Sequence, residues 1–172
     1  MDGFCGIGDL GRFFWAMKIS TKTRYALRFL VDLAMHEQAG FVSLPDIANR
    51  QEVSKKYFES IVSKLKQCGF VVTTRGYMGG YRLARPASEI TLGEVMRLTE
   101  DEFEMVHCLK SPNPCSRGGS CATLAFWHQF QDRINSYLDS VTLQDVVDLQ
   151  RGGDSCDRMF SLGSKEKMRL TA

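Results

Sequence analysis

Residues 54–86 read SKKYFESIVSKLKQCGFVVTTRGYMGGYRLARP, and this stretch decides the fold. Ser54 has a hydroxyl that can cap the start of a helix. After it, apolar side chains recur every three to four residues until Gly69, which predicts a helix over this range. The other face of this helix carries mainly basic and hydroxyl-bearing residues. Two β-rich runs follow, 70–75 and 81–84, and the glycine-rich sequence between them predicts a hairpin. A hairpin placed directly behind a basic helix is typical of a winged helix-turn-helix.

Two further helices are expected before this stretch. From Ser20 the apolar residues repeat with helical spacing, and Ala39-Gly40 closes the segment. Residues 43–46, Ser-Leu-Pro-Asp, provide a capping hydroxyl, an early proline and an acid three residues after the cap. A short second helix is therefore expected there. Two helices, a tight turn and a basic third helix form a helix-turn-helix, whose later helix enters the major groove.

The predicted DNA-contacting residues lie at the start of the third helix and on the wing. Residues 54–86 hold seven Lys or Arg and one acid, whereas 89–106 holds six acids and one arginine. For an isolated helix, a basic face that is merely solvated is the alternative. Here the helix spacing, the charge distribution and the wing all favour DNA binding. Glycines at the wing tip allow the backbone to approach phosphates, and an arginine there could enter a narrow minor groove. The candidates are Ser54, Lys55, Lys56, Tyr57, Glu59, Ser60, Arg75, Gly76, Gly79, Gly80 and Arg82.

The region after the wing predicts helices that pair two chains. Thr91-Leu-Gly-Glu94 is a capping box that opens a short helix. A long helix is expected from beyond Cys121 to about Ser140, and a further short one begins near Thr142. The apolar residues of the long helix fall at intervals of three and four, as in helices that pack side by side. Packing within one chain is the alternative, but a winged domain contacts only a short half-site, which favours a two-fold dimer. The stripe consists of Trp127, Phe130, Ile134, Tyr137 and Val141.

Three cysteines, Cys108, Cys115 and Cys121, lie on one loop with Pro112 and Pro114 between them. Thiolates are soft ligands that suit iron-sulfur clusters, zinc or copper(I). Gaps of six and five residues are wider than those of zinc ribbons, so the sulfurs can surround something larger than one zinc ion. The loop itself leaves four interpretations open: a cluster, zinc or another metal, a metal-free thiol sensor, or inert cysteines. Among the other cysteines, Cys68 is expected to be a buried small side chain.

Residues 17–150 resemble the winged helix-turn-helix family of the iron-sulfur cluster regulator (IscR) and the nitric-oxide-sensitive repressor (NsrR). The matching pieces are MKISTKTRYA (17–26), SKKYFES (54–60), RGYMGGYRLARP (75–86), ITLGEV (90–95) and the three loop cysteines. The resemblance implies a homodimer on a palindromic operator, with the third helix in the major groove and the wing in the minor groove. It also implies that Cys108, Cys115 and Cys121 ligate a [2Fe-2S] or [4Fe-4S] cluster and that Tyr57, Glu59 and Arg75 contact DNA.

The fourth cluster ligand departs from the family pattern. Some members place a histidine three residues after the third cysteine, where this chain has Leu124. Others use an acid in the first helix of the partner subunit, where this chain has Arg24. His128, one helical turn beyond Leu124, is a candidate substitute, as are His107 and a cysteine outside the loop. A single histidine is more often a surface or packing residue.

Glu59 also has two interpretations. An acid at this position of the third helix can accept a hydrogen bond from cytosine but repels phosphate, so it could bias operator choice. Alternatively, it pairs with Lys55 or Lys56 on the helix surface.

The sequence therefore predicts a mainly α-helical fold with a small β-hairpin wing, a winged helix-turn-helix domain plus a long dimerisation helix. The expected parts are a flexible extension (1–16), the DNA-binding domain (17–86), the cysteine loop and dimerisation helices (87–150) and a disordered tail (151–172). No stretch approaches a membrane span of about 18 apolar residues, and residues 1–16 do not resemble a secretory signal, so the cytoplasm is expected.

The expected function is a dimeric transcription regulator that senses redox, iron-sulfur or nitric-oxide status through a cluster and binds double-stranded DNA. A cluster-free regulator that uses its thiols or zinc is the alternative. An iron-sulfur electron carrier is less favoured, because the sequence has no second cofactor motif. It also has no nucleophile elbow and no phosphate loop, so no enzyme, small-molecule substrate or membrane partner is expected.

Overall fold

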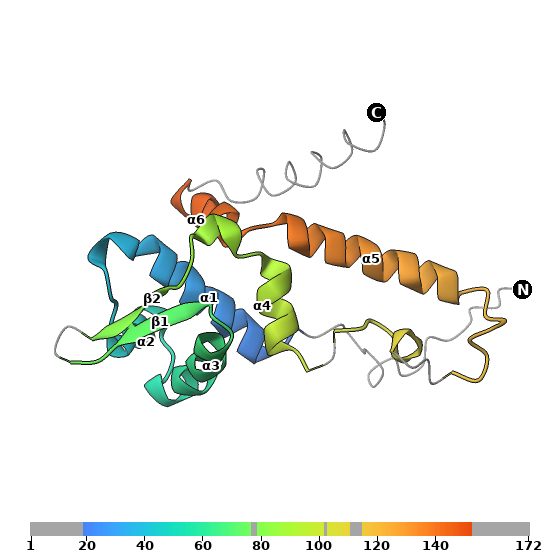
Figure 1. The fold of residues 1–172 in the computed structure, drawn as a ribbon, viewed down its shortest axis with the longest axis horizontal. Coiled ribbons are helices and arrows are strands. Elements are labelled where there is room, and N and C mark those ends of the chain that lie inside the picture. Colours follow the sequence, from blue (N-terminus) through green and yellow to red (C-terminus); the bar gives the residue numbers. More distant parts are fainter. Residues whose placement is uncertain (1–18, 77–78, 102, 111–114, 153–172) are drawn as a thin grey trace, which may run out of the picture.

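Six α-helices, a two-stranded antiparallel sheet and three short 3-10 helices make up the described part of the computed structural model (Figure 1). The structure describes residues 19–76, 79–101, 103–110 and 115–152. The predicted mainly helical fold with a hairpin wing is confirmed. The α-helices are α1 (Thr21–Met35), α2 (Leu44–Gln51), α3 (Lys55–Gln67), α4 (Leu92–Thr99), α5 (Leu124–Ser140) and α6 (Leu143–Arg151). The remaining elements are β1 (Val71–Thr74), β2 (Gly80–Leu83), η1 (Glu37–Ala39), η2 (Ala87–Glu89) and η3 (His107–Leu109).

The helices begin at the caps that the sequence indicates. The hydroxyl of Ser43 accepts a hydrogen bond from the Asp46 amide at 3.3 Å, and Thr91 with Glu94 forms the expected reciprocal capping box at the start of α4. The first helix ends earlier than expected, at Met35, and the chain continues to residue 39 as the 3-10 helix η1. Since caps depend on neighbouring residues alone, the sequence predicts starts better than ends.

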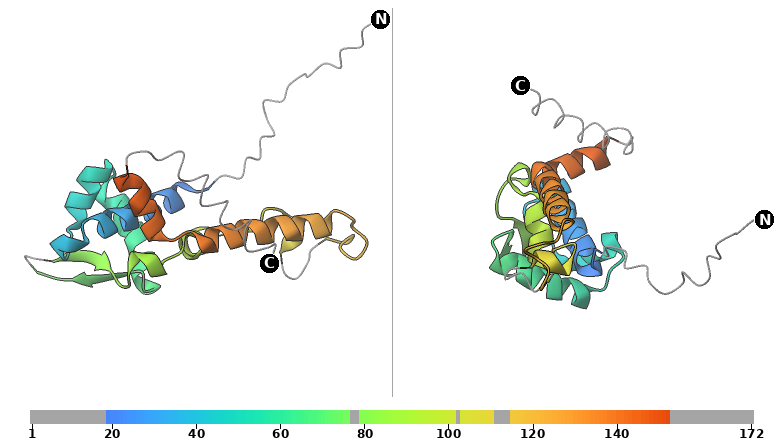
Figure 2. Two further views of the ribbon diagram at one scale, coloured as in Figure 1. Left: turned by 90° about the horizontal axis from the view of Figure 1, so that it is seen from above. Right: turned by 90° about the vertical axis from the view of Figure 1, so that its right-hand side faces the viewer.

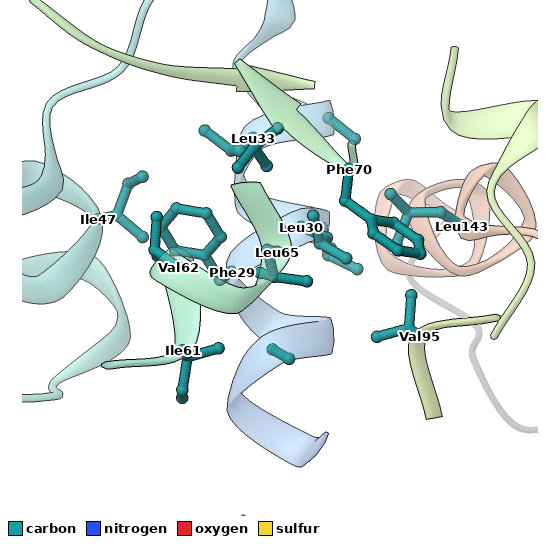
Figure 3. Packing of buried hydrophobic residues seen from close by; sticks show 14 of the residues in the cluster. Phe29, Leu30, Leu33, Ile47, Ile61, Val62, Leu65, Phe70, Val95 and Leu143 are labelled. Carbon is teal, nitrogen blue, oxygen red and sulfur yellow. The ribbon is translucent and has the colours of Figure 1, made fainter. Parts of the chain in front are cut away.

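One hydrophobic core runs through the winged domain and on into α4 and α6 (Figure 3). Phe29 of α1 and Phe58 of α3 are fully buried, with ring centroids 5.5 Å apart. On the other side of α1, Val95 of α4 and Leu143 of α6 are equally buried and join the same cluster. The helices that follow the wing therefore complete the core that α1 to α3 begin.

The wing is broader than a hairpin, because a third segment pairs with it. β1 and β2 are antiparallel, with Val71 opposite Leu83 and Thr74 opposite Gly80. The amide of Val42 donates to the carbonyl of Tyr81 at 2.9 Å, and the amide of Tyr81 donates back at 2.8 Å. A side chain on Gly80 would collide with the Val42 backbone, so this close approach requires glycine.

Two distant segments are joined where the chain leaves and re-enters the winged domain. The Leu92 amide donates to the Val141 carbonyl at 2.9 Å, and the Leu143 amide donates to the Ile90 carbonyl at 2.7 Å. Between these points the chain forms α4, the cysteine loop and α5. α5 extends from the winged domain as an arm, with the segment that contains η3 beside it (Figures 1 and 2).

A buried carboxylate connects α1 to α2. Asp32 is only 3% exposed and accepts two hydrogen bonds from Arg50, at 2.6 and 3.0 Å, and one from Gln51 at 3.0 Å. Burial alone would raise the pKa of Asp32, but the hydrogen bonds from Arg50 and Gln51 and the charges of Arg50 and His36 outweigh it and leave the pKa below 3.8. The charged form of Asp32 is therefore the one that the fold stabilises.

Replacing Asp32 with Asn is expected to lower the free energy of unfolding by about 1–2 kcal/mol at pH 7, because Arg50 loses its charged partner and is itself about one-third exposed. Since the folded-state pKa is depressed, the stabilisation by Asp32 is complete above about pH 4 and is lost as the pH falls through the folded pKa. Urea unfolding at several pH values should show the difference between the two proteins shrinking on acidification. Glu37→Gln, an exposed acid, is the matched control; an equal difference at all pH values would contradict this assignment.

Candidate nucleic-acid interface and cysteine loop

The third helix, α3, separates a buried apolar face from an exposed polar one. Its hydroxyl cap is formed, since Ser54 accepts from the Tyr57 amide at 3.3 Å. The Ser60 hydroxyl donates to the Tyr57 carbonyl at 2.7 Å. The buried face consists of Phe58, Ile61, Val62 and Leu65. The exposed residues near its start are Lys55, Lys56, Glu59 and Ser60, all of them predicted to contact DNA.

Aromatic contacts fix the rotation of α3. The ring of Tyr57 packs edge-on against Tyr25 of α1, with centroids 5.6 Å apart. Tyr25 also contacts Phe58, and the guanidinium of Arg28 lies 5.2 Å from the Tyr25 ring. These contacts hold Tyr57, a predicted DNA-contacting residue, half-buried against α1. The sequence prediction missed Tyr25, because this contact joins two helices far apart in the chain.

Glu59 adopts the surface pairing that was one of its two interpretations. Its carboxylate lies 3.7 Å from the Lys55 ammonium, one helical turn away, and both side chains are more than half exposed. Such a pair contributes little to stability and exchanges readily for other partners.

The wing places exposed charge beside a tight glycine turn. Arg75 is exposed, and Gly76 has a φ of 111°, which other residues rarely adopt. The Gly79 amide donates to the Gly76 carbonyl at 2.9 Å, and a side chain on Gly79 would collide with that oxygen. The guanidinium of Arg82 stacks over Phe41 at 5.0 Å, so part of its position is set outside the hairpin. The tip residues 77–78 lie outside the described residues.

The cysteine loop places its three predicted ligands in different local structures. Cys108 is half-buried within η3, Cys115 is exposed at the start of a turn, and Cys121 is half-buried just before α5. The turn between the last two is closed by hydrogen bonds from Gly118 to Cys115, at 3.0 Å, and from Ser120 to Arg117, at 3.0 Å. Residues 111–114, with both prolines, lie outside the described residues.

The environment of Cys121 favours its thiolate. Its sulfur lies 3.2 Å from the Thr123 hydroxyl. Hydrogen bonds from the side chain and amide of Thr123, and from the Leu124 amide, lower the pKa of Cys121 below its ordinary value. Thiolate is the form that binds metals and the form that is oxidised. Lowering of this pKa is therefore compatible with both the cluster and the thiol-sensor interpretations.

The donor set, three thiols and a histidine, suits a soft metal. Among the described residues, no three His, Cys, Asp or Glu side chains converge in a way that could hold a metal ion. His128, the candidate fourth ligand, is exposed on α5 and lines a groove of about 410 Å³ together with Leu109, the neighbour of Cys108.

Of the three cysteines outside the loop, the structure describes only Cys68. Cys68, expected to be buried, is exposed, because it is the C-cap of α3 and its side chain lies beyond the buried face. That prediction was wrong. Cys5 and Cys156 lie outside the described residues.

The long helix α5 has no buried residue in the single chain. Phe126, Phe130 and Tyr137 are 57%, 39% and 38% exposed and lie along one side of the helix. The rings of Phe126 and Phe130 stack with centroids 6.0 Å apart. Of the predicted stripe, Val141 is buried in the chain itself, and Phe126 was missed. Within the described residues, no helix is both long and apolar enough to cross a bilayer.

Comparison with known proteins matches this architecture over most of the chain. Residues 19–149 match Rrf2, described as an iron-dependent transcriptional regulator. The chain belongs to the Rrf2 family. Its curated relatives include the HTH-type transcriptional regulator IscR of Xenorhabdus nematophila, which is 37% identical over 145 residues, 84% of this chain and 88% of the relative. The resemblance to the IscR family is thereby confirmed.

Solved structures of other Rrf2 regulators share the fold. The T. potens IscR structure superposes with a TM-score of 0.65 at 32% identity, over 81% of this chain and 92% of that one. The structure of CymR, titled the global cysteine regulator of B. subtilis, superposes with a TM-score of 0.63 at 35% identity, over 76% and 96%. This Rrf2 protein is accordingly a DNA-binding transcriptional regulator and not an enzyme, as predicted.

Proposed function

We propose that this Rrf2 regulator is a homodimer that binds a palindromic operator and changes its affinity with the state of an iron-sulfur cluster held by Cys108, Cys115 and Cys121. The observation that carries the proposal is the joint position of the cysteine loop and α5. η3, with Cys108, packs against α5, and Cys121 lies three residues before the start of that helix. Binding at the loop would therefore act on the arm that pairs the subunits.

The DNA-binding part of the proposal is supported by the exposed surface of α3 and the wing. Polar residues at the start of α3 are turned away from the core, and Arg75 stands at the wing turn. The proposed contacts are Ser54, Lys55, Lys56, Tyr57, Glu59, Ser60, Arg75, Gly76, Gly79, Gly80 and Arg82. α3 would read base edges, and the glycine turn would approach phosphates.

Dimerisation is supported by the exposed aromatic side of α5. Aromatic rings of this size are rarely left in water along one helix, and burying them against a second copy would be strongly favourable. A two-fold dimer would place two α3 helices on two half-sites of one operator.

The cluster part of the proposal is supported by the chemistry of the donors. When bound, the cluster would supply a centre that oxygen or nitric oxide can alter. Cys108, Cys115 and Cys121 would hold it, and His128 is the proposed fourth ligand because it shares a groove with the residue after Cys108. Leu124 and Arg24, at the positions where relatives provide a ligand, cannot serve.

The second candidate function is a regulator of the same fold without a cluster. It is favoured by the lowered pKa of Cys121, since thiolates are oxidised reversibly. CymR, which has the same fold, is titled the global cysteine regulator of B. subtilis.

Anaerobic purification separates these candidates. Coloured protein with matching amounts of iron and acid-labile sulfide would support the cluster. Substitution of His128 would then change the visible spectrum if His128 is the fourth ligand. Colourless protein rich in zinc would establish a zinc regulator, and colourless protein without metal would establish the thiol regulator.

Replacing Arg75 with Ala is expected to lower affinity for an operator duplex by about 10–100-fold, the loss of one well-placed arginine contact. Titrations at several salt concentrations should also show a smaller dependence of binding on salt. Arg151→Ala removes the same charge from the exposed end of α6 and should bind as the unmodified protein does. Equal affinity of the Arg75 and Arg151 variants would remove the wing from the proposed interface.

A further inference from the structure

The base of the wing is bound to α4 by one arginine. Arg85, two residues after β2, donates from Nη2 to both carboxylate oxygens of Glu94 at 2.9 Å each. Its Nη1 donates to the Glu89 carbonyl at 2.8 Å, and its guanidinium lies 5.4 Å from the ring of Phe70 at the start of the wing. One side chain thus contacts Phe70 just before β1, the 3-10 helix η2 and α4.

Glu94 has a second role, in the cap of its own helix. Its Oε2 accepts a hydrogen bond from the Thr91 amide at 2.9 Å, which closes the capping box. Burial alone would raise the pKa of Glu94, but hydrogen bonds from Thr91 and Arg85 and the charge of Arg85 outweigh it and lower the pKa. The carboxylate is therefore charged and held in place at neutral pH.

The helix to which the wing is bound is itself fixed at two further points. Arg97 on α4 forms an ion pair with Asp139 of α5, and a side chain on Gly93 would occupy the place of that carboxylate. At the C-terminal end of α4, Glu100 accepts hydrogen bonds from the Ser20 amide, at 2.8 Å, and from the Thr23 hydroxyl. α4 is thus held by both α1 and the dimerisation arm.

We infer that Arg85 and Glu94 are positioning residues for DNA recognition: their pair sets where the wing stands relative to α3. The inference rests on the proposed DNA interface and adds residues that need not touch DNA. The two strands of the wing contain only four residues each, so the direction of the hairpin depends on contacts outside it, which are the pairing of Val42 with Tyr81 and the Arg85–Glu94 pair. The Arg85 guanidinium is held from three sides, because Nη2 donates to both Glu94 oxygens, Nη1 donates to the Glu89 carbonyl and the plane lies near the Phe70 ring, so its position is geometrically specific.

Glu94→Gln is the decisive variant, because glutamine retains the acceptor for the Thr91 amide while losing the charge that holds Arg85. The probe is a duplex selected from a randomised pool by the unmodified protein. Glu94→Gln is expected to lower affinity for this duplex by about 3–30-fold, the range for residues that act on a site without touching its ligand. The same substitution in the Arg75→Ala protein should lower affinity by a smaller factor, since one of the wing contacts that the pair positions is already absent.

A merely structural role would give a different pattern. In that case the loss would be equal in the Arg75→Ala background, or the unfolding midpoint would fall with the affinity, and either result overturns the inference. Equal affinity of Glu94→Gln and the unmodified protein overturns it as well. Glu89→Gln, whose exposed side chain lies beside the pair, is the control. If the unmodified protein selects no duplex at all, the proposed function fails before this inference is reached.

Discussion

Replacing Phe130 with Glu is expected to convert the proposed homodimer into a monomer and to lower operator affinity by more than about a hundredfold. Phe130 lies between Phe126 and Tyr137 on the exposed side of α5, and its ring stacks on Phe126. A carboxylate there would be buried twice at a two-fold interface, without a partner of opposite charge in the stripe. A monomer then contacts one half-site only.

Sedimentation or light scattering would measure the assembly, and titration with the selected duplex would measure the affinity. Gln129→Glu adds the same charge at an exposed position on another side of α5 and should leave both unchanged. A Phe130→Glu protein that stays dimeric would show that the subunits pair through a different surface.

Replacing Cys115 with Ala is expected to abolish visible absorbance in anaerobically purified protein while the dimer persists. Cys115 lies in the exposed turn of the loop, so its loss should leave the core intact. Operator affinity should change by about 5–150-fold, the usual size of coupling between two sites. The reference for this change is the operator affinity of the cluster-loaded protein.

Cys68→Ala is the matched control for this experiment. It removes an exposed thiol from the end of α3, outside the loop, and should keep both the absorbance and the iron content. Unchanged absorbance together with unchanged DNA binding in Cys115→Ala would contradict the sensing role of the loop.

The local features of the fold were predictable from the sequence, because caps and turns depend on neighbouring residues. Ser54 caps α3 and Thr91 opens α4 as expected. Contacts between distant segments were not predictable in the same way. Two such contacts are the backbone pairing of Val42 with Tyr81 and the ion pair of Arg85 with Glu94. Both join separate elements, and no periodicity in the sequence indicates them.

The candidate site divides along the same line. Periodicity identified the exposed polar face of α3, because a 3.6-residue repeat distinguishes the two sides of a helix. It misjudged Val141, which is buried within the single chain, and it overlooked Phe126. Cysteine spacing indicated a ligand loop, but spacing does not fix where sulfurs point. The domain boundaries and the roles of the candidate DNA-contacting and ligand side chains remain predictions.

The hydrogen bonds between residues 90–92 and 141–143 give the molecule a modular plan. The chain between these two ranges begins and ends at the same place on the DNA-binding domain, so the two ends of this segment are neighbours. Changing the length of a segment whose ends are neighbours has a small cost in loop-closure entropy. Natural variation can therefore lengthen the loop, replace its ligands or remodel the arm without altering the DNA-contacting surface. The same DNA-binding domain is then compatible with many kinds of signal.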